Sequence, residues 1–145
     1  FVWVENDCQV EILTFEDEEG RKVFWHSSSH VMAQAVKRLF PEIKLAIGPA
    51  IDEGFYYDFD RDESFSTSDL EKIEQEMAKI IAEDYAFCRE DVPREEALNN
   101  LEKLDEPYKV ELVQDLPEDA HISFYQQGES LRIFVQVLMF LPQVK

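Results

Sequence analysis

Several residue types are scarce in this 145-residue chain, and each scarcity excludes a class of protein. With only Cys8 and Cys88 there is no disulfide framework, so we expect a reducing, cytoplasmic compartment. No run of about 18 apolar residues occurs, so we expect no membrane-spanning segment. Residues 1–7 lack a basic start followed by a long apolar stretch, and we interpret them as a short leader that is not a signal peptide.

Basic residues are also scarce, because 14 Lys and Arg stand against 32 Asp and Glu, giving a net charge of −18. Nucleic-acid binding needs clustered cations to contact phosphates, so this balance excludes a free-standing nucleic-acid binder. Most acidic runs, such as residues 16–19 and 58–63, are typical of solvated loops and helix faces. An RNA partner would have to be attracted mainly by another domain.

Apolar residues are plentiful, at 45% of the chain, and 11 of them are phenylalanines. This is enough to build the core of one domain. Apolar spacing predicts helices over residues 27–40, 69–85 and 94–104, and favours a helix over residues 108–114. Ser68 is the expected N-cap of the second helix, and Pro93 the expected first residue of the third.

Strands are predicted over residues 10–15, 86–92 and 122–126, and residues 16–21 read as a turn around Gly20. Residues 52–54 indicate a hairpin between two extended runs. Helices and strands mix without a regular βαβ alternation. The sequence therefore predicts an α+β fold, with a mixed, mainly antiparallel sheet packed against helices.

The strongest chemical pattern is His26-Ser27-Ser28-Ser29-His30 near the predicted helix start. Histidines at positions i and i+4 of a helix lie on one face, where they can grip a metal ion, or a water and a substrate group. A pair of capping or half-exposed histidines is the alternative, because this spacing alone is a weak motif.

The residues around this pair extend the pattern. The strings His26-Ser27-Ser28-Ser29-His30-Val31-Met32-Ala33-Gln34-Ala35 and Ala46-Ile47-Gly48-Pro49-Ala50-Ile51-Asp52-Glu53-Gly54-Phe55-Tyr56-Tyr57-Asp58 resemble the editing domain of bacterial-type threonyl-tRNA synthetases, which is related to alanyl-tRNA editing domains. Residues 106–112 resemble a further segment of that domain. The resemblance covers residues 8–129 and implies the editing-domain type of α+β fold.

The resemblance implies hydrolysis of serine wrongly attached to threonine tRNA, with His26, His30 and Lys109 as catalytic residues and Gly48 and Tyr57 lining the substrate pocket. A neutral histidine can take a proton from water, and a lysine can hold the water or the developing negative charge. A tight pocket can admit serine and reject threonine by crowding its methyl group.

The family is expected to continue after residue 129 with Asp-Leu-Cys-x-Gly-Pro-His-Val-Pro, whose Cys and His complete the editing pocket. Residues 130–145 contain neither residue. Read from the third base of codon 130, the codons can spell Phe-Thr-Asp-Leu-Cys-x-Gly-Pro-His-Val instead. We therefore interpret the chain as a single truncated editing domain with a frameshifted tail at residues 130–145, impaired by the loss of the Cys-x-x-x-His half-site. A genuine apolar strand or helix over residues 131–141 is the alternative.

Two other functions stay open, namely a small metal-binding module and a non-catalytic tRNA-contact domain. No cofactor is required by the editing chemistry, although Zn²⁺ is possible at an incomplete site formed by His26 and His30. No glycine-rich phosphate loop is present, so the ATP and Zn²⁺ of a ligase would belong to an absent catalytic domain. The implied partner is mischarged tRNA, bound through the full-length enzyme, and the apolar tail allows a dimer.

Overall fold

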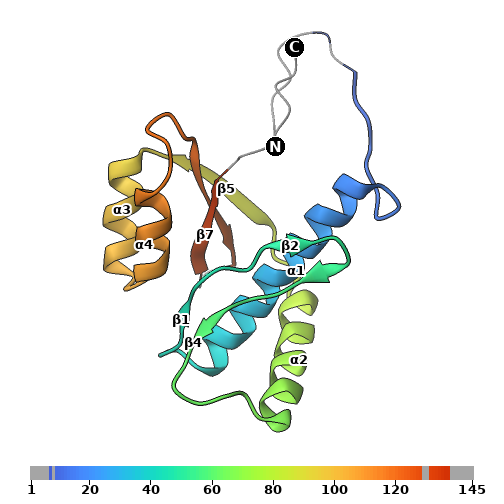
Figure 1. Cartoon of the computed structure of the whole chain (residues 1–145). Helices are drawn as coiled ribbons and strands as arrows, with labels where there is room; N and C mark the ends of the chain where they lie inside the picture. Colours follow the sequence, from blue (N-terminus) through green and yellow to red (C-terminus); the bar gives the residue numbers. More distant parts are fainter. Residues whose placement is uncertain (1–6, 8, 129–130, 138–145) are drawn as a thin grey trace.

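The computed structural model describes residues 7, 9–128 and 131–137 of the chain. Helices and small antiparallel sheets alternate along it, which confirms the α+β prediction (Figure 1). The helices are α1 (Glu18–Leu39), α2 (Thr67–Ala82), α3 (Arg94–Lys103) and α4 (Pro107–Gln114). No described helix is both long and apolar enough to cross a bilayer.

The strands of the described residues form three antiparallel sheets. β1 (Lys44–Leu45) pairs with β4 (Phe59–Asp60), and β2 (Ala50–Ile51) pairs with β3 (Gly54–Phe55) across the predicted hairpin. β5 (Phe87–Val92), β6 (Ile122–Gln127) and β7 (Leu131–Val137) form the largest sheet, in that order. The helices α3 and α4 lie together beside this sheet, whereas α1 and α2 lie side by side next to the short strands (Figure 1).

The two largest apolar clusters of the described residues lie one in each group. The first joins α1, α2 and the segment before β1, and consists of Val31, Ala35, Val36, Ile43, Ile73 and Ile80. The second joins α3 and α4 to the large sheet, and consists of Val92, Ala97, Leu101, Val113, Ile122 and Phe124. Burial of apolar surface is the main stabilising term in both.

The start of α1 differs from the prediction. Described residues 9–14 have no regular secondary structure, so the predicted strand is wrong. A turn lies at residues 15–16, but α1 begins at Glu18 rather than at residue 27, so the turn is not centred on Gly20. Acidic residues in the first turn favour this helix start. Gly20 lies inside the helix, where a Cβ atom would come within 1.9 Å of the Thr14 carbonyl oxygen. This glycine therefore makes room for a backbone approach instead of forming a turn.

The N-cap of α2 is also displaced from the prediction, from Ser68 to Ser66. The Ser66 side chain accepts a hydrogen bond from the Asp69 backbone N–H, and the Asp69 carboxylate accepts one from the Ser66 backbone N–H. This reciprocal capping box fixes the helix start two residues earlier than expected.

Later elements follow the predictions more closely. The strand predicted over residues 86–92 is β5, the predicted helix over residues 108–114 is α4, and Pro93 is the N-cap of α3 rather than its first residue. Residues 131–137 pair with β6 as β7, so this part of the tail is a strand. The rest of the tail and residues 1–6 lie outside the described residues. The origin of the tail stays a prediction.

Candidate functional site

The two histidines lie on one face of α1, more than two turns inside the helix and not at its start. Their Nε2 atoms are 2.8 Å apart and their ring centroids 4.3 Å apart. At that distance one Nε2 must carry a proton and donate it to the other, so the pair is joined by an N–H···N hydrogen bond. The sequence prediction that both rings share a face is confirmed.

Both imidazoles are held in the neutral form. Burial, the nearby His26 and the charge of Lys109 together lower the pKa of His30 to about 3. Burial also lowers the pKa of His26. A neutral imidazole can accept a proton, which is what a general base must do near pH 7.

Lys109 comes from α4, far along the chain, yet its charge acts on His30. Its amine is buried and lies 3.0 Å from the Oε2 atom of Glu106. Burial lowers the pKa of Lys109 to about 8, while the Glu106 carboxylate opposes this shift. At neutral pH the amine is therefore mostly charged and available to hold an anion.

Gly48 and Tyr57 lie in direct contact near the same helix. A Cβ atom on Gly48 would come within 2.1 Å of the Tyr57 ring, so only glycine fits there. The Gly48 carbonyl oxygen lies 3.0 Å from the Ser29 hydroxyl on α1, which also lies 2.8 Å from the His26 carbonyl oxygen. Burial and the charge of Glu106 raise the pKa of Tyr57.

Known proteins similar to this chain include threonine–tRNA ligases. Over 126 residues, or 87% of the chain, it is 61% identical to the threonine–tRNA ligases of Caldanaerobacter subterraneus subsp. tengcongensis and Acetivibrio thermocellus, and 60% identical to that of Clostridium kluyveri. The matched part of this chain is homologous to a segment of the threonine–tRNA ligases. The resemblance of the sequence strings to threonyl-tRNA synthetases is thereby confirmed.

The chain spans about a fifth of the length of these ligases, since the match covers 20% of each. It therefore corresponds to one segment of a much longer enzyme. A comparison with profiles of known protein families gives no match.

The histidine pair of this chain does not fit a metal ion as it stands. Two nitrogens bound to one tetrahedral zinc at about 2.0–2.1 Å each would lie roughly 3.3 Å apart, and would not be hydrogen-bonded to each other. Among the described residues, no group of three or more His, Cys, Asp or Glu side chains could hold a metal ion. We therefore derive no chemical step through a metal.

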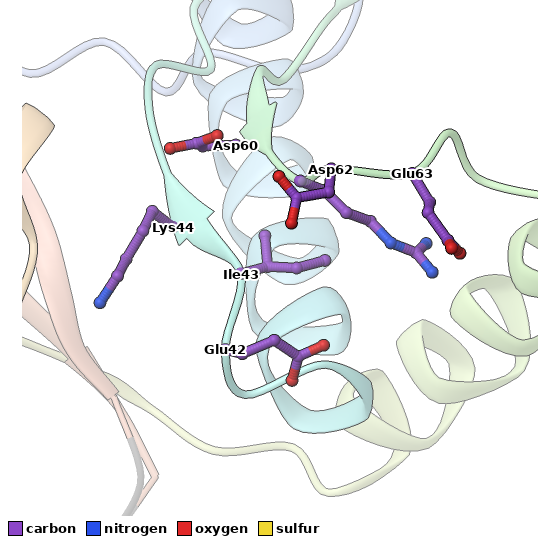
Figure 2. A pocket seen from close by; sticks show the side chains of 7 residues that line it. Glu42, Ile43, Lys44, Asp60, Asp62 and Glu63 are labelled. Atoms are coloured by element: carbon purple, nitrogen blue, oxygen red, sulfur yellow. The ribbon is translucent and has the colours of Figure 1, made fainter.

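A separate open cavity of about 510 Å³ lies at the end of β1 and β4 (Figure 2). Four carboxylates line it together with Ile43, Lys44 and Arg61, and these carboxylates belong to Glu42, Asp60, Asp62 and Glu63. The lining of this cavity does not include His26, His30 or Lys109. This acidic cavity is therefore distinct from the histidine site.

Sequence reasoning missed the polar residues that support the site. Glu106 is 2% exposed and lies between Lys109 and Lys37, whose Nζ atom is 3.3 Å from Glu106 Oε1. Gln34 is fully buried one turn after His30, and its amide atoms have no hydrogen-bond partner in the described part of the chain. Glu106 and Lys109 are three residues apart, a spacing that predicts an ion pair on a helix, and this was the available signal.

Proposed function

We propose that this chain is the post-transfer editing domain of a threonine–tRNA ligase, a hydrolase of the ester bond in seryl-tRNA. The observation that carries the proposal is the neutral histidine pair of α1 facing a buried, charged amine from α4. A base beside a cation is the minimum that ester hydrolysis requires. Homology to threonine–tRNA ligases supports the assignment.

His30 and His26 act as a unit in this proposal. One ring takes the proton of an attacking water, and the second ring, hydrogen-bonded to it at 2.8 Å, orients it. The lowered pKa values keep the rings neutral at the pH of the cell, but they also limit how strong a base each ring can be.

Lys109 stabilises the negative charge that develops on the ester oxygen. Its amine works in a buried setting, where a charge acts more strongly than it does in water. Removing one group that stabilises an oxyanion typically lowers the kcat of an enzyme by about 10²–10³-fold.

Gly48 and Tyr57 form the wall that distinguishes serine from threonine. An added carbon on Gly48 would collide with the Tyr57 ring, so the two residues are closely packed against each other. A single methyl group changes binding in an apolar pocket by about 1–3 kcal/mol. A difference of this size is what an editing pocket needs if it is to admit serine and exclude threonine.

This copy is impaired, because residues 130–145 contain no Cys-x-x-x-His segment to complete the pocket. The net charge of −18 further weakens the encounter of the isolated chain with tRNA. Catalysis in the full enzyme therefore needs both the missing half-site and a more basic partner domain.

Release of serine from seryl-tRNA tests the proposal. We expect the unaltered chain to release serine slowly or not at all, and a chain whose tail is restored to the Cys-x-Gly-Pro-His frame to release it faster. Threonyl-tRNA is the matched control and should stay charged. Equal release of serine and threonine, or no release by the restored chain, would contradict the proposal.

A further inference from the structure

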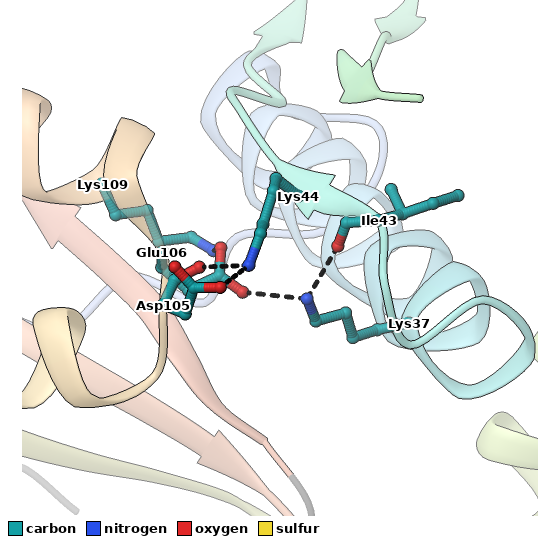
Figure 3. A network of polar contacts seen from close by, with 6 residues as sticks. All are labelled: Lys37, Ile43, Lys44, Asp105, Glu106 and Lys109. Atoms are coloured by element: carbon teal, nitrogen blue, oxygen red, sulfur yellow. Dashed lines mark hydrogen bonds and ion pairs between the residues drawn. The ribbon is translucent and has the colours of Figure 1, made fainter. Parts of the chain in front are cut away.

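We propose that Glu106 is a positioning residue of this site, whose buried carboxylate holds the Lys109 amine beside the histidine pair and ties it to α1 through Lys37. The inference rests on the proposed function, since it names the residue that keeps the catalytic amine in place. Figure 3 shows the two lysines approaching the carboxylate from opposite sides.

The carboxylate has one cation on each oxygen. Its Oε2 atom lies 3.0 Å from Lys109 Nζ, and its Oε1 atom lies 3.3 Å from Lys37 Nζ. Lys37 is itself fixed, because its amine donates a 2.7 Å hydrogen bond to the Ile43 carbonyl oxygen. The three charged groups therefore form one connected network.

The network joins the two helices that supply the catalytic groups. Lys37 follows His30 by seven residues on α1, about two helical turns, so both side chains lie on the same face. Glu106 is the N-cap residue of α4, which carries Lys109 one turn later. A single carboxylate thus fixes the amine of one helix relative to the histidines of the other.

Because Glu106 and Lys109 are both buried, the Glu106 carboxylate strongly affects the charge of its neighbours. Glu106 is 2% exposed and Lys109 5% exposed, so solvent cannot replace the charge if the carboxylate is removed. The charged or titratable groups acting on Lys109 are Glu106 and Lys37, and Lys109 in turn acts on His30. Glu106 favours the charged amine, whereas burial and Lys37 disfavour it.

A neighbouring ion pair provides a contrast. Lys44 on β1 contacts the Asp105 carboxylate and donates a 2.9 Å hydrogen bond to the Asp105 carbonyl oxygen (Figure 3). The Asp105 side chain is 80% exposed, so water can substitute for it. Only the Glu106 carboxylate is both buried and in contact with Lys109 among the described acidic residues.

The test is a pH titration of Lys109 by NMR, with ¹³C-labelled lysine and the Lys109→Arg variant to assign its signal. In Glu106→Gln the midpoint should fall by about 1–3 pH units, because an opposite charge within contact distance shifts a pKa by that amount. Glu106→Asp keeps the charge with a shorter reach, and should give a smaller fall. Glu111→Gln removes an exposed carboxylate from the same helix, and should leave the midpoint unchanged.

If Glu106 has only a structural role, its replacement shifts the titration midpoint of Lys109 in the opposite direction. If Glu106→Gln only loosened the fold, Lys109 would become solvated and its midpoint would rise towards the ordinary lysine value. A rise, or no change, would overturn the proposal, and if Glu106→Gln does not fold, the direction of the shift in Glu106→Asp decides. The titration uses no substrate, so its outcome is independent of whether the chain hydrolyses seryl-tRNA.

Discussion

At the residue scale, position 48 shows how strictly the proposed pocket wall is packed. A Cβ atom there would lie 2.1–2.8 Å from three atoms of the Tyr57 ring. The ring cannot move away freely, because it stacks on Phe59 with centroids 4.9 Å apart.

We therefore expect Gly48→Ala to lower the free energy of unfolding by about 1–3 kcal/mol, the usual cost of overpacking. Urea denaturation measures this change. In a Tyr57→Ala background the same substitution should cost much less, because the ring that it strikes is gone. An equal cost in both backgrounds would show that the ring is not the obstacle.

The lowered pKa of His30 predicts a specific pH dependence of the free energy of unfolding. Its pKa falls from an ordinary value near 6.5 to about 3 on folding, so between these values the unfolded chain binds a proton that the folded chain does not. Stability from this group is complete above about pH 6.5 and is lost as the pH falls towards 3, by at most about 1.4 kcal/mol per pH unit.

His30→Gln should therefore flatten the loss of stability between pH 6 and pH 4, as followed by denaturant unfolding. His121→Gln, which replaces an exposed histidine outside the site, is the matched control and should keep the original slope. Identical slopes for the two variants would mean that folding does not hold His30 in the neutral form.

Residue types at the site can be predicted in part. The i, i+4 spacing of the histidines is enough to place them on a common helix face, and similarity to a family points to Lys109, Gly48 and Tyr57. The spacing of Glu106 and Lys109 indicates an ion pair, but the joint role of Glu106 and Lys37 is not predictable from it. That role depends on burial between two helices, which spacing along one helix does not reveal.

At the scale of elements, helix starts are harder to predict than helix interiors. The apolar stripe of α2 is periodic and predicts the helix, but Ser66 and Ser68 are both good N-cap residues by type. The reciprocal bonds between Ser66 and Asp69 decide between them, and these bonds depend on backbone geometry.

The capping box of α2 gives a direct prediction. Ser66→Ala should lower the free energy of unfolding by about 1 kcal/mol, because one helical N–H loses its acceptor. Ser68→Ala, at the second residue of the helix, should change it little. Thermal or urea unfolding of both variants checks this, and a larger effect at Ser68 would reassign the cap.

The start of α1 shows the same difficulty. Gly20 and the acidic run before it indicate a turn by composition, but the segment before the helix folds back against the glycine backbone. Arg21 then donates hydrogen bonds to the carbonyl oxygens of Phe15 and Glu16. These contacts join residues only five or six apart in the chain, and they hold the segment folded back on the helix start, so the strand predicted there does not form.

At the scale of the whole molecule, the fold brings three distant segments to one site. The helix α1 carries the histidines, the stretch around β2 and β3 carries the proposed wall, and α4 carries the amine. The α+β class follows from the mixture of helical and strand patterns. The pairing of short strands such as β1 with β4 does not, because two-residue strands carry too little pattern to be recognised.

The measurement that tests the central claim most directly is the rate of serine release from seryl-tRNA by the tail-restored chain, with His30→Ala compared against His121→Ala. We predict that His30→Ala lowers the rate by about 10²-fold, the low end of the usual contribution of a positioned acid–base group because the lowered pKa weakens the base, and that His121→Ala leaves the rate unchanged. Equal rates for the two variants would contradict the claim that the α1 histidines form the hydrolytic site.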